Sequence, residues 1–105
     1  MIEIVETIEN LSTEPIAVWF EPWCESHSIP PSQSFRVIAV SDQAGHIEII
    51  REREQITVYG WPGCTMRVFC GAELVDDFSS KVPEVPPGMS TKDFIGFCFG
   101  GPGGP

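Results

Sequence analysis

Short runs of this chain alternate apolar and polar residues with a period of two, and turn-forming residues separate the runs. Successive side chains of a β-strand point to opposite faces, so this period is typical of half-buried strands. Runs of this kind follow one another at spacings of about 8 to 12 residues, as in a small β-sandwich. They cover residues 2–8, 15–23, 34–40, 46–50, 55–59, 64–70 and 72–76. We therefore predict an all-β fold, a small antiparallel β-sandwich of about seven short strands.

Turn residues define the connections between these strands. The segment "ENLSTEP" follows the first run, and "GWPG" at 60–63 joins two later runs through a tight turn. We assign residues 24–27 to the turn after the second run. The segment "SHSIPPSQS" is predicted to be a loop, because Pro30 and Pro31 have no N–H to donate to a central sheet ladder.

The alternation also predicts which side chains fill the interior. One face of the runs is apolar, and a strand buries one face against the opposite sheet. The residues that we expect inside are Ile16, Val18, Phe20, Phe35, Val37, Ile56, Val58, Met66 and Val68.

The opposite face of the same runs is unusually aromatic, with charges of both signs among the rings. An exposed aromatic face is typical of a ligand groove or a protein interface, because Trp and Tyr combine a large apolar area with a hydrogen-bonding group. Arg36 also lies on this face. The predicted ligand or interface residues are Trp19, Glu21, Trp23, Tyr59, Trp61, Arg67, Phe69 and Phe97.

The last quarter of the chain differs in composition. We divide the chain into a β-sandwich domain at 1–80 and a Pro/Gly-rich extension at 81–105, with a short helix or an extended segment at 90–99. The apolar side chains of this extension need an apolar partner, and the outer aromatic residues are the obvious one. Three outcomes stay open: the extension packs on its own domain, it packs on a neighbouring subunit, or it leaves a groove for a small molecule.

Charge and hydropathy exclude several classes of function. The chain of 105 residues carries fifteen carboxylates against six Lys and Arg, a formal charge of −9, which repels nucleic acid and anionic lipid. We expect a homodimer, and as further partners a basic protein or a cationic small molecule; the acidity also serves solubility. No run approaches the roughly 20 apolar residues of a membrane span, and "MIEIVETIEN" lacks a basic start. We predict a cytoplasmic protein with reduced cysteines.

Cys24 and His27 form the one spacing typical of a metal site. A C-x-x-H turn can place a thiolate and an imidazole on one zinc ion, but strong zinc motifs come as two paired sets of ligands. The other candidates, Cys64, Cys70, Cys98 and His46, are isolated in the sequence. We therefore expect neither a metal nor another cofactor.

The same segment offers the best candidates for catalysis. Nucleophilic catalysis needs a base within hydrogen-bond reach of the nucleophile, and neither histidine lies in a recognisable motif of this kind. We assign no catalytic residues and interpret the chain as a small binding or interaction module that uses an aromatic sheet face. The alternative is a small-molecule binder or minor enzyme that uses Glu21, Cys24 and His27 beside that face.

Three short motifs carry a resemblance to known proteins. "EPW" at 21–23, "IPPSQSF" at 29–35 and "VYGWPG" at 58–63 resemble motifs of short uncharacterised bacterial β-sandwich proteins, in which an EPW strand end and an IPPG-like turn recur. The resemblance covers about residues 2 to 76. Cys24 and Ser32 stand here where those motifs have glycines. The resemblance implies a β-sandwich, without an activity or functional residues.

Overall fold

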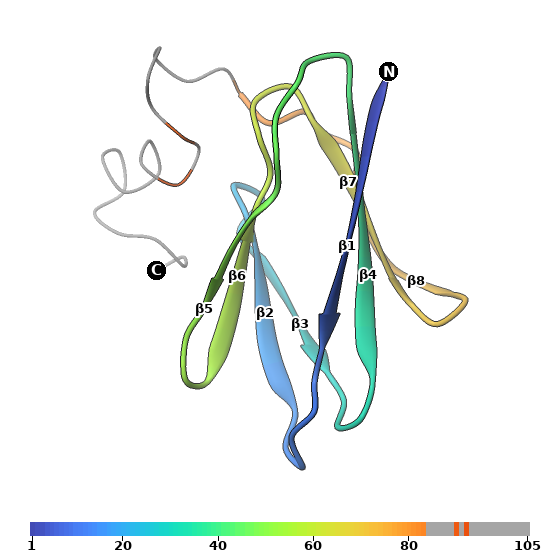
Figure 1. Cartoon of the computed structure of the whole chain (residues 1–105), viewed down its shortest axis with the longest axis vertical. Helices are drawn as coiled ribbons and strands as arrows, with labels where there is room; N and C mark the ends of the chain where they lie inside the picture. The colour runs from blue at the N-terminus through green and yellow to red at the C-terminus, as the bar shows by residue number, and fades with distance from the viewer. Residues whose placement is uncertain (84–89, 91, 93–105) are drawn as a thin grey trace.

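The fold is an all-β sandwich, as predicted. A computed structural model of the chain describes residues 1–83, 90 and 92. Within them, two four-stranded sheets face each other (Figure 1). The predicted segment at 90–99 lies outside the described residues, except for Ser90 and Lys92. The strands are β1 (Ile2–Glu9), β2 (Ile16–Glu21), β3 (Glu25–Ile29), β4 (Ser34–Ser41), β5 (Glu48–Arg51), β6 (Gln55–Tyr59), β7 (Thr65–Cys70) and β8 (Glu73–Phe78).

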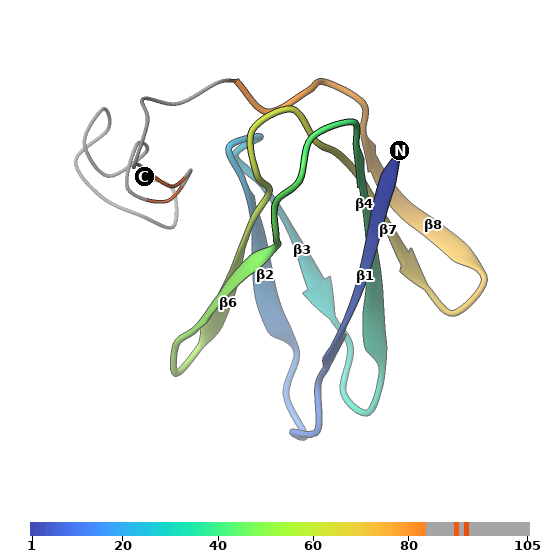
Figure 2. The ribbon, with the colours of Figure 1, turned by 45° about the horizontal axis from the view of Figure 1, so that its top comes forward.

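The two sheets have the strand orders β1-β4-β7-β8 and β3-β2-β6-β5. Neighbouring strands pair antiparallel as predicted, except for β2 and β6, which pair parallel. A parallel pair needs a long crossover connection, and residues 22–54 supply one that contains β3, β4 and β5. Figure 2 shows the two layers, with the β5–β6 hairpin and the β7–β8 hairpin at opposite sides of the molecule.

The core lies between the sheets and consists of the predicted inner residues. Eight of the nine are buried in one apolar cluster, and Ile16 is partly buried against it. Val82 also lies in this cluster, beyond the predicted domain boundary at residue 80. Its backbone N–H donates to the carbonyl of Cys64 over 3.0 Å, and its carbonyl accepts from Gly63 over 2.8 Å. The segment after β8 is therefore tied to the sandwich as far as Val82.

Strand β3 was not predicted. It is an edge strand that pairs with β2 from Phe20↔Glu25 to Ile16↔Ile29, across the segment that we assigned to a turn and a loop. The prolines do exclude a strand at their own positions, but β3 ends at Ile29, immediately before Pro30.

Two connections place a non-glycine residue in the left-handed region. Cys24, in the turn between β2 and β3, has φ of 58°, and Ser32, in the turn between β3 and β4, has φ of 64°. These are the two positions at which the resembling motifs have glycine. Side chains with a Cβ are strained at such angles, which explains why glycine suits both positions.

Asn10 builds the connection between β1 and β2 and is fully buried. Its side-chain amide donates to the carbonyls of Glu14 (2.8 Å) and Ile29 (2.9 Å). Its side-chain oxygen accepts from the backbone N–H of Ser12 (2.9 Å) and from the Ser12 hydroxyl (2.7 Å). This side chain therefore ties the first turn to the end of β3.

Candidate functional site

The candidate site lies on the outward-pointing side of β2 and β6. In this parallel pair Trp19 lies opposite Thr57, and Glu21 lies opposite Tyr59. Their neighbours along each strand, such as Val18 and Val58, fill the core, so these four side chains point away from it. We call Trp19, Glu21, Thr57 and Tyr59 the β2–β6 outer face.

Three of these four side chains are buried, although they point away from the core. Glu21, Thr57 and Tyr59 are each 1% exposed, and Trp19 is partly buried. Tyr59 lies outside the apolar cluster between the sheets, so its burial arises on the other side of the sheet. Glu21 and Tyr59 therefore point outward without being open to solvent.

Two buried polar atoms of this face have no hydrogen-bond partner. Among the described residues, the buried side-chain atoms without a hydrogen-bond partner are Glu21 Oε2 and Thr57 Oγ1. A buried polar atom without a partner costs about 1–3 kcal/mol, and more when it is charged. Natural proteins rarely leave such atoms unpaired. A ligand that donates hydrogen bonds to these two atoms would therefore bind this face more tightly.

Cys24 lies at one end of this face and contacts Glu21. The Cys24 thiol hydrogen bonds to the Glu21 carboxylate, and this bond raises the pKa of Cys24, with smaller contributions from burial and from the negative charge. The thiolate is the reactive form of cysteine, so at neutral pH Cys24 is held in its unreactive form. This geometry does not favour a catalytic nucleophile.

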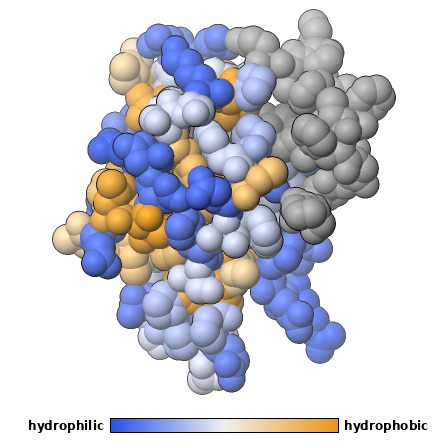
Figure 3. Space-filling model, turned by 180° about the vertical axis from the view of Figure 1, so that it is seen from behind, coloured by the Kyte–Doolittle hydropathy of each residue, from blue (hydrophilic) through white to orange (hydrophobic). Residues whose placement is uncertain are grey.

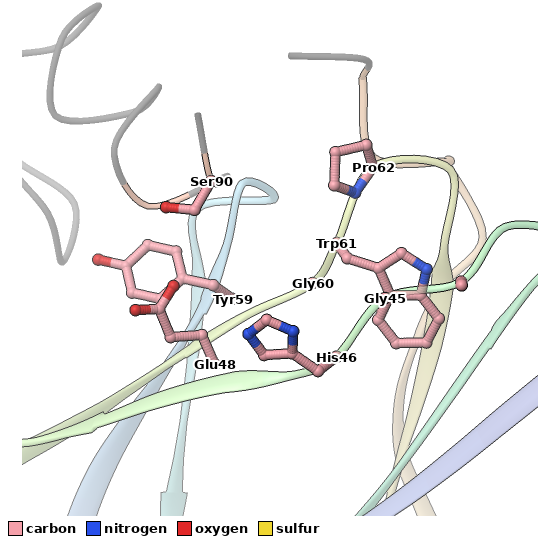
Figure 4. A pocket seen from close by; sticks show the side chains of 9 residues that line it. Gly45, His46, Glu48, Tyr59, Gly60, Trp61, Pro62 and Ser90 are labelled. Carbon is pink, nitrogen blue, oxygen red and sulfur yellow. The ribbon is translucent and has the colours of Figure 1, made fainter. Parts of the chain in front are cut away.

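A small pocket lies at the Tyr59 end of the face. It has a volume of about 210 Å³, and Figure 4 shows His46, Glu48, Tyr59 and Ser90 around it. Glu48 and Tyr59 lie opposite each other in the antiparallel β5–β6 pair. Five further residues complete the lining. Ala44 and Gly45 lie in the β4–β5 connection, and Gly60, Trp61 and Pro62 lie in the β6–β7 turn.

Trp23 and Trp61 were predicted on the same aromatic face as Trp19, but neither is part of the β2–β6 outer face. Trp61 is 5% exposed in the core cluster, and its Nε1 donates to the carbonyl of Gln43 over 2.9 Å. Trp23 packs against the core and stacks on Phe78 of the other sheet. Each lies two residues beyond the end of a strand, where the chain turns and the alternation of faces no longer applies.

Arg67 and Phe69 belong to the other sheet. They lie on its outer side with Arg36, and both guanidinium groups lie over the Phe69 ring, at 5.8 Å for Arg67 and 5.2 Å for Arg36. The predicted aromatic surface is thus divided between two sheets. Phe97, the remaining predicted residue, lies outside the described residues. Viewed from behind, the described surface is a mosaic of hydrophilic and hydrophobic residues (Figure 3).

The structure also separates the predicted set of Glu21, Cys24 and His27. Glu21 and Cys24 contact each other, whereas His27 Nε2 lies 2.6 Å from Asp76 Oδ2 of β8. Sequence reasoning missed Thr57, Glu48 and Asp76. Thr57 and Glu48 occupy outward positions of their strands, but their relation to Glu21 and Tyr59 depends on strand pairing that no local pattern encodes.

Comparisons of the chain with protein-family models, with curated proteins and with solved structures gave no significant match. In the part of the chain that the structure describes, no helix has the length and apolar character needed to cross a membrane.

Proposed function

We propose that this chain is a small interaction module, that its binding surface is the β2–β6 outer face, and that the ligand of this face is an aromatic polypeptide segment. The segment that we assign to it is residues 93–99 of the chain itself, "DFIGFCF", from the same copy or exchanged with a second copy in a homodimer. One observation carries the proposal. Glu21, Thr57 and Tyr59 are 1% exposed at positions that point away from the core.

Connectivity supports this choice of ligand. Ser90 lines the pocket together with Tyr59, so the chain reaches the end of the face three residues before the segment begins. Three residues span at most about 10 Å, so the start of the segment lies no farther than this from Ser90.

The chemistry of the segment fits the face. Residues 93–99 contain three phenylalanines and one isoleucine, and burying one such side chain contributes about 1.5–3 kcal/mol. The backbone N–H groups of a bound segment would be the donors that pair with Glu21 Oε2 and Thr57 Oγ1. A basic segment of another protein is the alternative ligand, because the Glu21 carboxylate has an unpartnered oxygen within this face.

The size of the pocket favours a side chain over a free small molecule. Pockets for drug-sized ligands have volumes of about 300–1,000 Å³, whereas this pocket has about 210 Å³. Such a volume suits one anchoring ring of a bound segment. The separation of His27 from Glu21 and Cys24 also supports an interaction module over the minor enzyme that the sequence left open.

A peptide titration tests the proposal. A shortened chain of residues 1–83 keeps all eight strands and Val82. We expect it to bind a synthetic peptide of residues 90–105 with one-to-one stoichiometry, measured by calorimetry and by tryptophan fluorescence. Trp19→Ala should weaken this binding at least tenfold, since Trp19 lies on the face.

Phe69→Ala is the matched control, because Phe69 is an aromatic residue on the outer side of the other sheet. It should leave the affinity for the peptide unchanged. The proposal fails if the folded 1–83 chain does not bind the peptide, or if both substitutions weaken binding equally. Light scattering of the full chain at several concentrations then distinguishes exchange between copies, which gives dimers, from binding within one copy.

A further inference from the structure

Three side chains that commonly bind metal ions meet at an open side of the sandwich, away from the β2–β6 outer face. They are Glu25 and His27 of β3 and Asp76 of β8. Each offers one ligand atom, and these three atoms lie within 4.8 Å of one another. Strands β3 and β8 are edge strands of the two different sheets, so the cluster bridges the sheets.

The pairing of β3 with β2 directs two of these side chains inward. Glu25 lies opposite Phe20 and His27 lies opposite Val18, and both partners are core residues. Directly paired residues of two strands project to the same face. Glu25 and His27 therefore point toward the space between the sheets, at the edge where no further strand of the described chain covers them.

Asp76 reaches the same place from the other sheet. It lies opposite Val68, a core residue, immediately beside a bulge in the β7–β8 pair. Bulges increase the local twist of a strand and change the direction of its side chains, and they are frequent beside functional sites. The bulge thus lies beside Asp76, whose carboxylate contacts His27 although the two residues are 49 positions apart in the sequence.

Within the described part of the chain, neither Lys nor Arg forms a salt bridge with this cluster. His27 Nε2 and Asp76 Oδ2 lie 2.6 Å apart, the separation of a hydrogen-bonded pair. Glu25 brings a second carboxylate to the same imidazole, and the described residues contain no salt bridge from Lys or Arg to either acid. Two carboxylates at this separation repel each other, and a bound divalent cation offsets both charges.

We propose that Glu25, His27 and Asp76 form a binding site for a divalent transition-metal ion of the Zn²⁺ type. One imidazole nitrogen and two carboxylate oxygens are a donor set that Zn²⁺ accepts, at bond lengths of about 2.0–2.2 Å. On binding, bonds from His27 Nε2 and Asp76 Oδ2 to the ion replace the hydrogen bond between these two atoms. The imidazole keeps its ring proton on Nδ1, any second ring proton passes to water, and the exposed Glu25 side chain moves in as the third ligand. The ion would join the edge strands of the two sheets.

The site is not recognisable in the sequence, because Asp76 lies 49 positions from His27. The expectation of no metal rested on Cys24 and His27, but Cys24 contacts Glu21 instead. The proposed site uses His27 without Cys24, and it is independent of the proposed interaction module.

A Zn²⁺ titration of the full chain tests the site. Cys24→Ser serves as the parent, because an exposed thiol also binds zinc. In histidine side-chain NMR spectra, we expect the His27 ring signals to change and saturate at one equivalent of Zn²⁺. The ring of His46 is the internal control and should not change.

Substitutions locate the ligands. Glu25→Gln and Asp76→Asn should each lower the Zn²⁺ affinity at least tenfold in calorimetry, whereas Asp77→Asn should leave it unchanged. Asp77 is the matched control, since it is the next residue of β8 and lies opposite the exposed Arg67. If Asp76→Asn does not fold, Glu25→Gln decides, because Glu25 is exposed.

Three results would overturn the proposal. The first is the absence of saturable Zn²⁺ binding at one equivalent. The second is an affinity that Glu25→Gln leaves unchanged. The third is an equal loss of affinity in Asp77→Asn, which would indicate a general effect of acidic charge.

Discussion

The ring of Trp23 stacks on the ring of Phe78, with centroids 4.9 Å apart and planes inclined by 19°. This contact joins the turn after β2 to the end of β8 in the other sheet. The Trp23 Nε1 also donates to the carbonyl of Ser80 over 3.0 Å. Trp23 therefore fastens the segment after β8 to the sandwich, whereas the alternation within the run at 15–23 predicted it to be a ligand or interface residue of an outer face.

Trp23→Ala should destabilise the fold. We expect a loss of about 2–3 kcal/mol, less than for a fully buried Trp, because Trp23 is only partly buried. Trp23→Phe keeps the stacking and removes the hydrogen bond, so its cost should be about 1 kcal/mol. Urea unfolding measures both variants. Equal stability of Trp23→Ala and the natural chain would contradict the structural role.

Asn10→Ala should lower the free energy of unfolding more than Ser12→Ala, a substitution at an exposed residue two positions away. Removal of the Asn10 amide leaves the buried carbonyl of Ile29 without its partner, so we expect about 2–4 kcal/mol. Ser12→Ala removes a hydroxyl from an exposed residue and should cost less than about 1 kcal/mol. Similar unfolding midpoints for the two variants would show that Asn10 does not organise the turn.

Ser32→Gly should stabilise the chain. The left-handed conformation costs a non-glycine residue about 1–2 kcal/mol, and glycine removes this cost. The greater freedom of glycine in the unfolded chain opposes folding and offsets about 0.5–1 kcal/mol of the gain. The expected net gain is about 0.5–1 kcal/mol in thermal or urea unfolding. Ser32→Ala is the control and should bring no gain, since it keeps a Cβ at φ of 64°. A gain from alanine would refute the backbone explanation.

Stability should decrease at high pH because of Cys64. This thiol is buried in the core, and burial raises its pKa from 9.0 to about 11. Below pH 9 the thiol is protonated in both the folded and the unfolded chain, so the contribution of Cys64 to the free energy of unfolding is fully present. It is lost as the pH rises from 9 to about 11, because the unfolded chain then releases the proton more readily than the folded chain.

The expected loss is on the order of 2 kcal/mol. Urea midpoints measured between pH 8 and 11 report it, and Cys64→Ala is the control. The difference between the two proteins removes the contribution of other groups that titrate in this range. Parallel pH dependences would contradict the assignment to Cys64.

The alternation of residues was sufficient to predict the sandwich and its interior, because inner residues such as Val18, Phe20 and Val58 follow a strictly local period. Strand β3 was not predicted, because "ESHSI" contains a single apolar residue, Ile29, and two of its inward positions hold Glu25 and His27. The candidate site was predicted only in part. Trp19, Glu21 and Tyr59 were named, but their common face follows from the parallel pairing of β2 with β6, which is a long-range property.

Gly45 illustrates a further limit of local patterns. A Cβ at this position would lie 2.1 Å from the indole ring of Trp61, so the glycine is required by a tryptophan sixteen residues later. No turn motif at 42–45 indicates this contact. The same long-range packing explains why Trp61 lies in the core and not on the predicted surface.

We propose that residues 93–99 bind the β2–β6 outer face, and nuclear Overhauser contacts in the full chain test this binding most directly. We predict contacts between the Tyr59 ring and the phenylalanine rings of this segment, since Tyr59 is 1% exposed on that face. A sample that mixes differently labelled copies assigns the contacts to one chain or to two. Tyr59 and Trp19 without any contact to residues 93–99, within or between copies, would contradict the account.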